Sequence, residues 1–265
     1  MITAGVDIGS TTSKAVLLNA DTILAQVVIP SGTVPQDTAR LVFDQCCESA
    51  GISKSHVEAV ATTGYGRRLA QFGDMVITEI KACGLGAVFT GSPDGSIGTI
   101  IDVGGQDTKV ITLNENGSID DFAMNDKCAA GTGRFLEMLA VKLEMDYNAF
   151  VESALSSNTM IHMNSTCAVF AESEVISLLA RNVDKCDIAA AAHYAIAERI
   201  GSMVRRVGCK DVVCFAGGGA RNRALVSAIE EVLDRSVYIP EFPQTMVALG
   251  AALAARDRLV KGDQS

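Results

Sequence analysis

The sequence contains no long hydrophobic run and little positive charge. No apolar stretch approaches the roughly 20 residues that a transmembrane helix needs, and the first residues lack the basic-then-apolar layout of a signal peptide. We therefore expect a cytoplasmic protein that does not enter a membrane. The 22 Lys and Arg residues are outnumbered by 31 Asp and Glu residues, which gives a net charge of −9. This balance predicts no binding to nucleic acid or to an anionic membrane, because both attract basic surfaces.

Two common signatures are also missing. There is no G-x-x-x-x-G-K-[ST] run, so a P-loop is not supported, and the 8 cysteines include no C-x-x-C pair. Cysteines in a cytosolic chain are reduced and indicate packing, catalysis or metal binding. The three histidines show no ligand-like spacing, and we expect surface or core positions for His56, His162 and His193.

The composition is that of an ordered protein. Hydrophobic residues make up 48% of the chain and charged residues 20%, and only 5 residues are proline. The length of 265 residues exceeds the usual size of one domain and suits two compact lobes. We expect an N-terminal lobe at residues 1–95 and a C-terminal lobe at residues 96–265.

An internal repeat supports the two lobes. Residues 6–18 read VDIGSTTSKAVLL and residues 101–113 read IDVGGQDTKVITL, and the two align without a gap. Asp7 falls on Asp102, and the glycines and lysines also match. Each copy predicts a strand, a glycine-rich turn, a strand, a second turn and a further strand. We therefore expect a duplicated α/β protein, with helices at 36–50, 133–144, 170–181, 187–207 and 222–234.

The repeated turns suit phosphate binding. Glycine lets backbone N–H groups approach a phosphate, while hydroxyl and lysine side chains add donors and positive charge. Asp7 and Asp102 are candidates to hold Mg²⁺ through water, because that ion keeps much of its hydration shell. The alternative of two ordinary hairpins leaves the recurrence of acid, glycine, hydroxyl and lysine in register unexplained. The expected phosphate-binding residues are Gly9, Ser10, Thr11, Thr12, Ser13, Lys14, Gly104, Gly105, Gln106 and Asp107.

A third glycine-rich segment, FAGGGARN at residues 215–222, follows near the C-terminus. With the paired hairpins it resembles the actin-like superfamily, which includes sugar kinases, heat-shock chaperones and actin, and which has two phosphate hairpins followed by an adenosine motif. The resemblance implies an actin-like (ribonuclease H-like) duplicated α/β fold with two lobes around a nucleotide cleft that binds ATP or ADP. The residues that it implies for adenosine are Gly217, Gly218, Gly219, Asn222 and Gln244.

Two segments that contain cysteine distinguish this chain from a generic kinase of that fold. MNDKCAAGTGRFLEML places Cys128 just ahead of a helix expected from Gly133, and NSTCAVFAESEVISLLA places Cys167 ahead of one expected from Phe170. A helix N-terminus stabilises a thiolate and suits it to metal ligation. Spacing alone favours unligated cysteines, because one subunit offers only half of a Cys₄ site. A two-fold dimer would bring four thiolates together, enough for a 4Fe-4S cluster.

Both cysteine segments closely resemble the activators (component A) of 2-hydroxyacyl-CoA dehydratases and the related ATPase subunits of benzoyl-CoA reductases. The resemblance runs through DIGSTTSK, TGYGR, IDVGGQDTKV, MNDKCAAGTGRFLE, FAESEVIS, AGGGARN and ALGAAL. It implies a homodimer in which Cys128 and Cys167 of both subunits hold one 4Fe-4S cluster. It further implies ATP hydrolysis that drives a low-potential electron to a partner iron–sulfur dehydratase, with ferredoxin or flavodoxin as the electron donor.

Several roles and alternatives remain open at this level. Gln106 is expected to orient the attacking water, because phosphoryl transfer needs positioning more than covalent chemistry, while Asp7 and Asp102 hold Mg²⁺. Cys83 lies in TEIKACGLGA, where dehydratase activators typically have Ser-Cys-His, so a benzoyl-CoA reductase or a double-cubane cluster protein is an alternative partner. Arg67 is either a docking residue or a solvated one. Rival functions are a small-molecule kinase, which needs a carboxylate base and a substrate pocket, and a nucleotide-dependent interaction module without redox chemistry.

Overall fold

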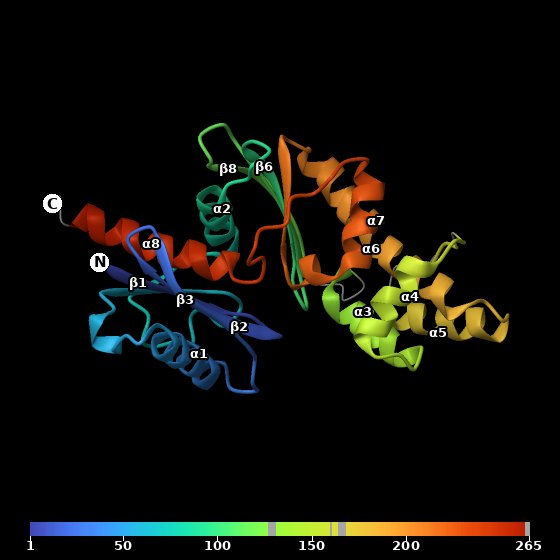
Figure 1. The fold of residues 1–265 in the computed structure, drawn as a ribbon, viewed down its shortest axis with the longest axis horizontal. Coiled ribbons are helices and arrows are strands. Elements are labelled where there is room, and N and C mark those ends of the chain that lie inside the picture. The colour runs from blue at the N-terminus through green and yellow to red at the C-terminus, as the bar shows by residue number, and fades with distance from the viewer. Residues whose placement is uncertain (127–130, 160, 164–167, 263–265) are drawn as a thin grey trace. The chain divides into compact units, whose positions relative to one another are not determined.

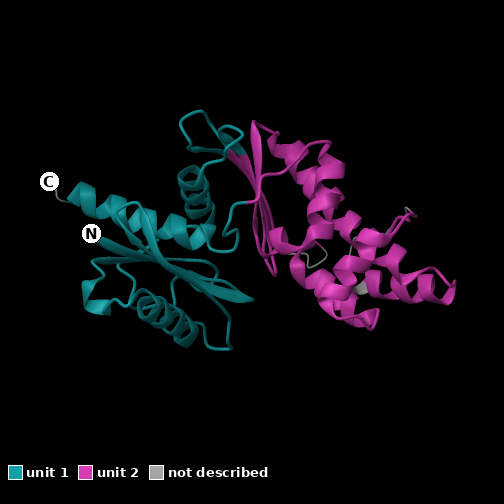
Figure 2. Ribbon diagram, viewed as in Figure 1, with its two compact units in different colours: residues 1–98, 113–120, 240–265 teal, residues 99–112, 121–239 magenta. Residues whose placement is uncertain are grey.

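Two compact units make up the fold in the computed structural model (Figure 2). The described part of the chain comprises residues 1–126, 131–159, 161–163 and 168–262 (Figure 1). Unit 1 contains residues 1–98, 113–120 and 240–265, and unit 2 contains residues 99–112 and 121–239. Within the described residues, every helix is too short or too polar to cross a membrane.

Unit 1 is built on a five-stranded sheet with the order β3-β2-β1-β4-β5. Neighbouring strands are antiparallel from β3 to β1, whereas β4 runs parallel to β1 and β5 runs parallel to β4. β1 and β4 are buried along almost their whole length, as expected for central strands that are covered on both faces. The strands are β1 (Ile2–Ile8), β2 (Thr12–Asn19), β3 (Thr22–Pro30), β4 (Ala59–Thr63) and β5 (Met75–Val76).

Helices cover the two faces of this sheet. Ala15 and Leu17 of β2 join a core cluster with α1 residues such as Phe43, whereas Val16 and Leu18 join a cluster with α8. Successive side chains of a strand point to opposite faces, so α1 and α8 lie on opposite sides of the sheet. The helices of unit 1 are α1 (Pro35–Ala50), α2 (Glu79–Thr90) and α8 (Met246–Gly262), with a short 3-10 turn η1 (Lys54–His56).

Helix α8 lies in backbone contact with its neighbours. A Cβ atom on Gly5 of β1 would overlap the carbonyl oxygen of Ala248, and one on Gly250 would overlap the carbonyl oxygen of Ala82 in α2. Only glycine permits approaches this close. This packing places residues 240–265 in unit 1, whereas the boundary expected from the sequence put them in the second lobe.

Unit 2 repeats the strand arrangement of unit 1. Its four-stranded sheet has the order β8-β7-β6-β9, which matches β3-β2-β1-β4. Asp102 pairs with Lys109 across β6 and β7 in the register in which Asp7 pairs with Lys14 across β1 and β2. The structure thus confirms the duplicated hairpin. The strands are β6 (Ile97–Val103), β7 (Thr108–Leu113), β8 (Ile119–Asn125) and β9 (Val212–Gly217).

A helical layer completes unit 2. Its core is centred on buried aromatic and aliphatic side chains that include Phe135, Phe150 and Phe215. The described helices are α3 (Gly133–Lys142), α4 (Tyr147–Ser156), α5 (Ala168–Ala180), α6 (Lys185–Val207) and α7 (Arg223–Leu233), with a 3-10 turn η3 (Gly218–Arg221).

Candidate functional site

The first glycine-rich turn joins β1 to β2 in unit 1. Asp7 is the next-to-last residue of β1 and lies opposite Lys14, whose Nζ is 3.0 Å from Asp7 Oδ2, and both side chains are largely buried. Ser13 is fully buried with its Oγ 2.9 Å from Ser31 Oγ, and Ser31 donates to the Gly9 carbonyl. Ser13 therefore braces the turn from inside. The other expected residues of the turn are more accessible, with Ser10 exposed and Gly9, Thr11 and Thr12 partly buried.

The second turn joins β6 to β7 in unit 2 and carries a buried lysine. Lys109 Nζ lies 2.8 Å from Asp107 Oδ2 and 3.7 Å from Asp102 Oδ2, and Lys109 is only 3% exposed. One ammonium group thus bridges two carboxylates. The carboxylate of Asp107 forms an ion pair with Lys109, whereas the neighbouring residue Gln106 is exposed. The sequence alignment matched Lys109 with Lys14 but did not predict this bridging role, since Asp107 has no acidic counterpart in the first turn.

The second turn is also bonded to the start of α3. Gly133 N–H donates to the Gly104 carbonyl at 3.0 Å, and Arg134 N–H donates to the Gly105 carbonyl at 3.1 Å. Thr108 Oγ1 donates to the Gly131 carbonyl at 2.5 Å. A helix N-terminus has backbone N–H groups without partners inside the helix, and the turn carbonyls satisfy two of them here. Backbone hydrogen bonds therefore link the second turn directly to the first residues of α3.

The adenosine-like segment forms a tight turn against β6. Gly217 has φ +80°, and a Cβ atom on it would overlap Asp102 Oδ1. A Cβ atom on Gly219 would lie 2.7 Å from Cβ of Val103. Glycine at both positions thus lets the turn lie directly on Asp102 and Val103. Of the other residues expected here, Gly218 begins η3 and Gln244 belongs to unit 1.

Asn222 has a structural role that the sequence analysis did not predict. Its Oδ1 accepts a hydrogen bond from Leu225 N–H, which makes it the N-cap of α7. Its Nδ2 donates to Tyr147 Oη and to His193 Nε2, both at 3.0 Å. The side chain is buried and its amide is fully used inside unit 2. An N-cap asparagine before an apolar helix is a signal from which this role could have been predicted.

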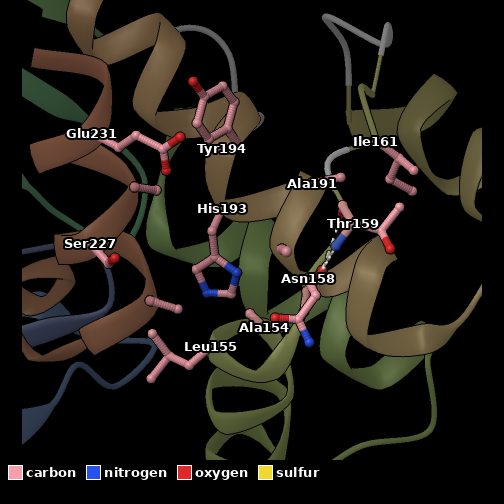
Figure 3. Close-up of a pocket in the computed structure, with 14 residues that line it drawn as sticks. Ala154, Leu155, Asn158, Thr159, Ile161, Ala191, His193, Tyr194, Ser227 and Glu231 are labelled. Atoms are coloured by element: carbon pink, nitrogen blue, oxygen red, sulfur yellow. Dashed lines mark hydrogen bonds between the residues drawn. The ribbon is translucent and has the colours of Figure 1, made fainter.

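A cavity of about 320 Å³ lies beside this network in unit 2, between α4, α6 and α7 (Figure 3). His193 points into the middle of the lining, with Glu231 and Tyr194 on one side and Asn158 on the other (Figure 3). None of the lining residues belongs to the glycine-rich turns. The lining residues are Ala154, Leu155, Ser157, Asn158, Thr159, Ile161, Ala190, Ala191, His193, Tyr194, Ala224, Ser227, Ala228 and Glu231.

The sequence predicted surface or core positions for the three histidines, and the structure places His56 and His162 on the surface and His193 in the core. Burial lowers the pKa of His193 from its usual 6.5 to about 4, and its Nδ1 donates to the Ala189 carbonyl at 2.7 Å. Nε2 accepts from Asn222, so the neutral imidazole satisfies both neighbours.

This buried histidine predicts acid sensitivity. The pKa of His193 is lower in the folded state than in the unfolded chain, so acid favours the unfolded chain, which binds the extra proton. The stability that the neutral histidine contributes is fully present above pH 6.5 and is lost as the pH falls towards 4. Between pH 7 and pH 5 the free energy of unfolding should fall by about 2 kcal/mol more in the wild type than in His193→Gln. Urea denaturation at both pH values measures this difference. His56→Gln, at an exposed position, should behave as the wild type, and equal pH dependence in all three proteins would contradict the prediction.

The expected cluster ligands, Cys128 and Cys167, lie outside the described residues. Among the described cysteines, burial raises the pKa of Cys46 and of Cys214 to about 12, which makes these two thiols poor metal ligands. Among the residues that the structure describes, no group of three or more His, Cys, Asp and Glu side chains is arranged to hold a metal ion.

Comparison with known proteins gives consistent matches. The model of the BadF/BadG/BcrA/BcrD ATPase family matches residues 4–255. The 2-hydroxyisocaproyl-CoA dehydratase activator of Clostridioides difficile is 42% identical over 258 residues, which is 97% of this chain and 96% of that protein. The (R)-2-hydroxyglutaryl-CoA dehydratase activating ATPase of Acidaminococcus fermentans is 40% identical over 261 residues, 98% of each chain.

Solved structures confirm the expected actin-like fold. The activator of the 2-hydroxyisocaproyl-CoA dehydratase from Clostridium difficile, with bound ADPNP, has a TM-score of 0.92 at 40% identity and covers 100% of this chain and 97% of that one. The ROK hexokinase from Thermus thermophilus has a TM-score of 0.56 at 16% identity, covers 99% and 100% of the two chains, and shares the fold alone.

Proposed function

The chain belongs to the BadF/BadG/BcrA/BcrD ATPase family, and on that premise we propose that it activates a 2-hydroxyacyl-CoA dehydratase by ATP-driven electron transfer. In this role the ATPase binds ATP and, as a homodimer, passes one low-potential electron to the partner iron–sulfur enzyme. The electron comes from ferredoxin or flavodoxin. A 4Fe-4S cluster, one per homodimer, supplies the low potential when it is bound to Cys128 and Cys167 of both subunits.

The glycine-rich turns carry the nucleotide chemistry in this proposal. Asp7 and Asp102 are largely buried carboxylates, each beside a lysine and a glycine-rich backbone, and carboxylate oxygens are the donors that Mg²⁺ prefers. Gln106 is exposed within the second turn, where its amide can orient the attacking water. Thr11 and Thr12 remain accessible as phosphate donors, whereas Ser13 acts by bracing the first turn.

The bonds between the second turn and α3 are the observation that carries the proposal. A phosphate held by backbone N–H groups of the second turn would bear on Gly104 and Gly105, the two residues whose carbonyl oxygens accept from Gly133 and Arg134 at the start of α3. Cys128 precedes this helix closely in the sequence. A nucleotide can shift a conformational equilibrium only by its difference in affinity for the two states, and this turn gives it direct contact with the cysteine segment.

Exposed apolar side chains support the homodimer. Val141 of α3 is 76% exposed, and Phe170 and Ile176 of α5 are 68% and 50% exposed. These helices are the ones that follow Cys128 and Cys167, so a two-fold contact through them would both cover apolar surface and bring the four thiolates together.

The unusual segment around Cys83 does not argue against a dehydratase partner. Ala82, Cys83 and Gly84 are buried in α2, and the Ala82 carbonyl packs on Gly250 of α8. The departure from Ser-Cys-His therefore alters packing inside unit 1 and presents no exposed group to a partner.

Anaerobic purification tests the proposal directly. We expect a brown protein with about four iron atoms per dimer, bleached by oxygen, that hydrolyses ATP without any added small-molecule acceptor. Hydrolysis without an acceptor separates this function from that of a small-molecule kinase. A colourless and iron-free protein after careful reconstitution would exclude the proposed electron transfer.

Substitutions in the turns should separate hydrolysis from iron binding. Lys14→Ala or Gln106→Ala should lower kcat for ATP hydrolysis by roughly 100-fold, the usual effect of removing a group that stabilises or orients the reacting atoms. Iron content should not change, because neither Lys14 nor Gln106 is an expected ligand of the cluster. Gln71→Ala, which removes another exposed glutamine, is the matched control. Unchanged turnover in Lys14→Ala and Gln106→Ala would show that these residues do not contribute to ATP hydrolysis.

A further inference from the structure

The turn after β4, TGYGR, lies directly on the carboxylate of Asp7. Gly64 has φ +89°, and a Cβ atom on it would lie 2.5 Å from Asp7 Oδ1. Gly66 N–H donates to the Ile8 carbonyl at 2.9 Å, and a Cβ atom on Gly66 would lie 2.5 Å from Cγ2 of Ile8. The two glycines allow this turn to form one wall around the Asp7 side chain.

The same geometry occurs around Asp102 in unit 2. Gly217 corresponds to Gly64, because its φ is also positive and a Cβ atom on it would overlap Asp102 Oδ1. Gly219 corresponds to Gly66, because a Cβ atom on it would overlap the side chain of Val103. Val103 is the residue that aligns with Ile8 in the internal repeat. The duplication therefore extends from the hairpins to the turns on the adjoining strands, although TGYGR and AGGGAR look unrelated as sequences. Each expected Mg²⁺ carboxylate has a glycine turn of its own.

The turn at Gly64 is additionally held by Arg67. Arg67 Nη1 donates to the Gly64 carbonyl at 2.9 Å and lies 3.7 Å from Glu79 Oε1 at the start of α2. Thr62 Oγ1 donates to the Arg67 carbonyl at 2.8 Å. The side chains of Arg67 and Glu79 are 31% and 19% exposed, so neither is a freely solvated charge. By contrast, Arg68 is exposed.

We propose that Arg67 and Glu79 form a clamp that fixes the Gly64 turn against Asp7, which makes Arg67 a positioning residue for the Mg²⁺–phosphate site and not a docking residue. The proposal rests on the function proposed for Asp7 above. Mg²⁺ demands near-ideal octahedral geometry, so a carboxylate that is free to change rotamer holds the hydrated ion less well. Without the clamp, the backbone at Gly64 can move away from Asp7, and the affinity of the site for Mg²⁺ falls.

The Mg²⁺ dependence of ATP hydrolysis tests the clamp. In Arg67→Ala the Mg²⁺ concentration for half-maximal activity should rise about tenfold, the size expected for one lost charge-assisted hydrogen bond. Arg67→Lys should recover part of this shift, because it retains the charge beside Glu79. Arg68→Ala is the matched control and should titrate as the wild type. Glu79→Gln should shift the titration in the same direction as Arg67→Ala, and the double variant should not exceed the larger single effect.

The outcomes separate the clamp from the proposed function. An active wild type in which Arg67→Ala and Arg68→Ala need the same Mg²⁺ concentration would overturn the clamp alone. So would a lower kcat and melting temperature in Arg67→Ala at an unchanged Mg²⁺ requirement, because that pattern shows a merely structural role. A wild-type protein that hydrolyses no ATP would contradict the proposed function itself. If Arg67→Ala does not fold, Arg67→Lys and Glu79→Gln decide by the same titration.

Discussion

Cys128→Ala, and separately Cys167→Ala, should yield a colourless protein without stoichiometric iron. In a homodimer each substitution removes two of the four thiolates at once, because both subunits contribute the same residue. A 4Fe-4S cluster held by only two cysteines lacks half of its ligands, so we expect loss of the cluster and not a small drop in affinity. Iron and sulfide analysis after anaerobic reconstitution measures this directly.

Nucleotide affinity should survive both substitutions, because the phosphate turns are built from other residues. Cys209→Ala is the matched control, since Cys209 is an exposed free thiol that lies outside both cysteine segments in the sequence, and it should retain full iron. Stoichiometric iron in Cys128→Ala or in Cys167→Ala would contradict the ligand assignment. If Cys209→Ala lost as much iron as Cys128→Ala and Cys167→Ala, the loss would reflect general destabilisation of the protein and not removal of a ligand.

Local patterns were sufficient to predict a large part of this fold. The repeated hairpins and the helices α1, α3, α5, α6 and α7 follow from glycine turns and apolar spacing within short windows. Three helices, α2, α4 and α8, were not predicted. Helix α8 is rich in alanine and glycine with little contrast between its faces, and its place is fixed by contact of Gly250 with α2 and of Ala248 with β1. Such packing depends on residues distant in sequence.

The sequence predicted which acids and glycines recur in the two turns, but not the residues that support them. Asp7 and Asp102 stand out because they recur in register, and the register was confirmed. Arg67 and Gly64 act on Asp7 through a turn on another strand, a contact between residues far apart in the sequence that no local motif encodes. Lys109 was visible as a conserved position of the repeat within this chain, yet its two carboxylate partners became apparent only in three dimensions.

Lys109→Met should destabilise the protein by about 3 kcal/mol and abolish most ATP hydrolysis. The substitution keeps the apolar stem but leaves Asp102 and Asp107 without their shared cation, and removing one partner of a buried ion pair is strongly destabilising. Lys14→Met is the matched comparison, because Lys14 is more accessible and forms its ion pair with Asp7 in the first turn. Its cost should be roughly 1 to 2 kcal/mol. Urea denaturation of both variants measures the difference.

A second substitution tests the charge argument for Lys109. Adding Asp107→Asn to Lys109→Met removes one of the two unpaired carboxylates and should restore about 1 kcal/mol of stability. Hydrolysis should stay low in the double variant, because the second turn still lacks the cation that holds Asp102. If Lys109→Met costs no more than Lys14→Met, or if Asp107→Asn restores nothing, the lysine is not the electrostatic centre of the turn. The bonds from Gly104 and Gly105 to α3 would then be what holds this turn in place.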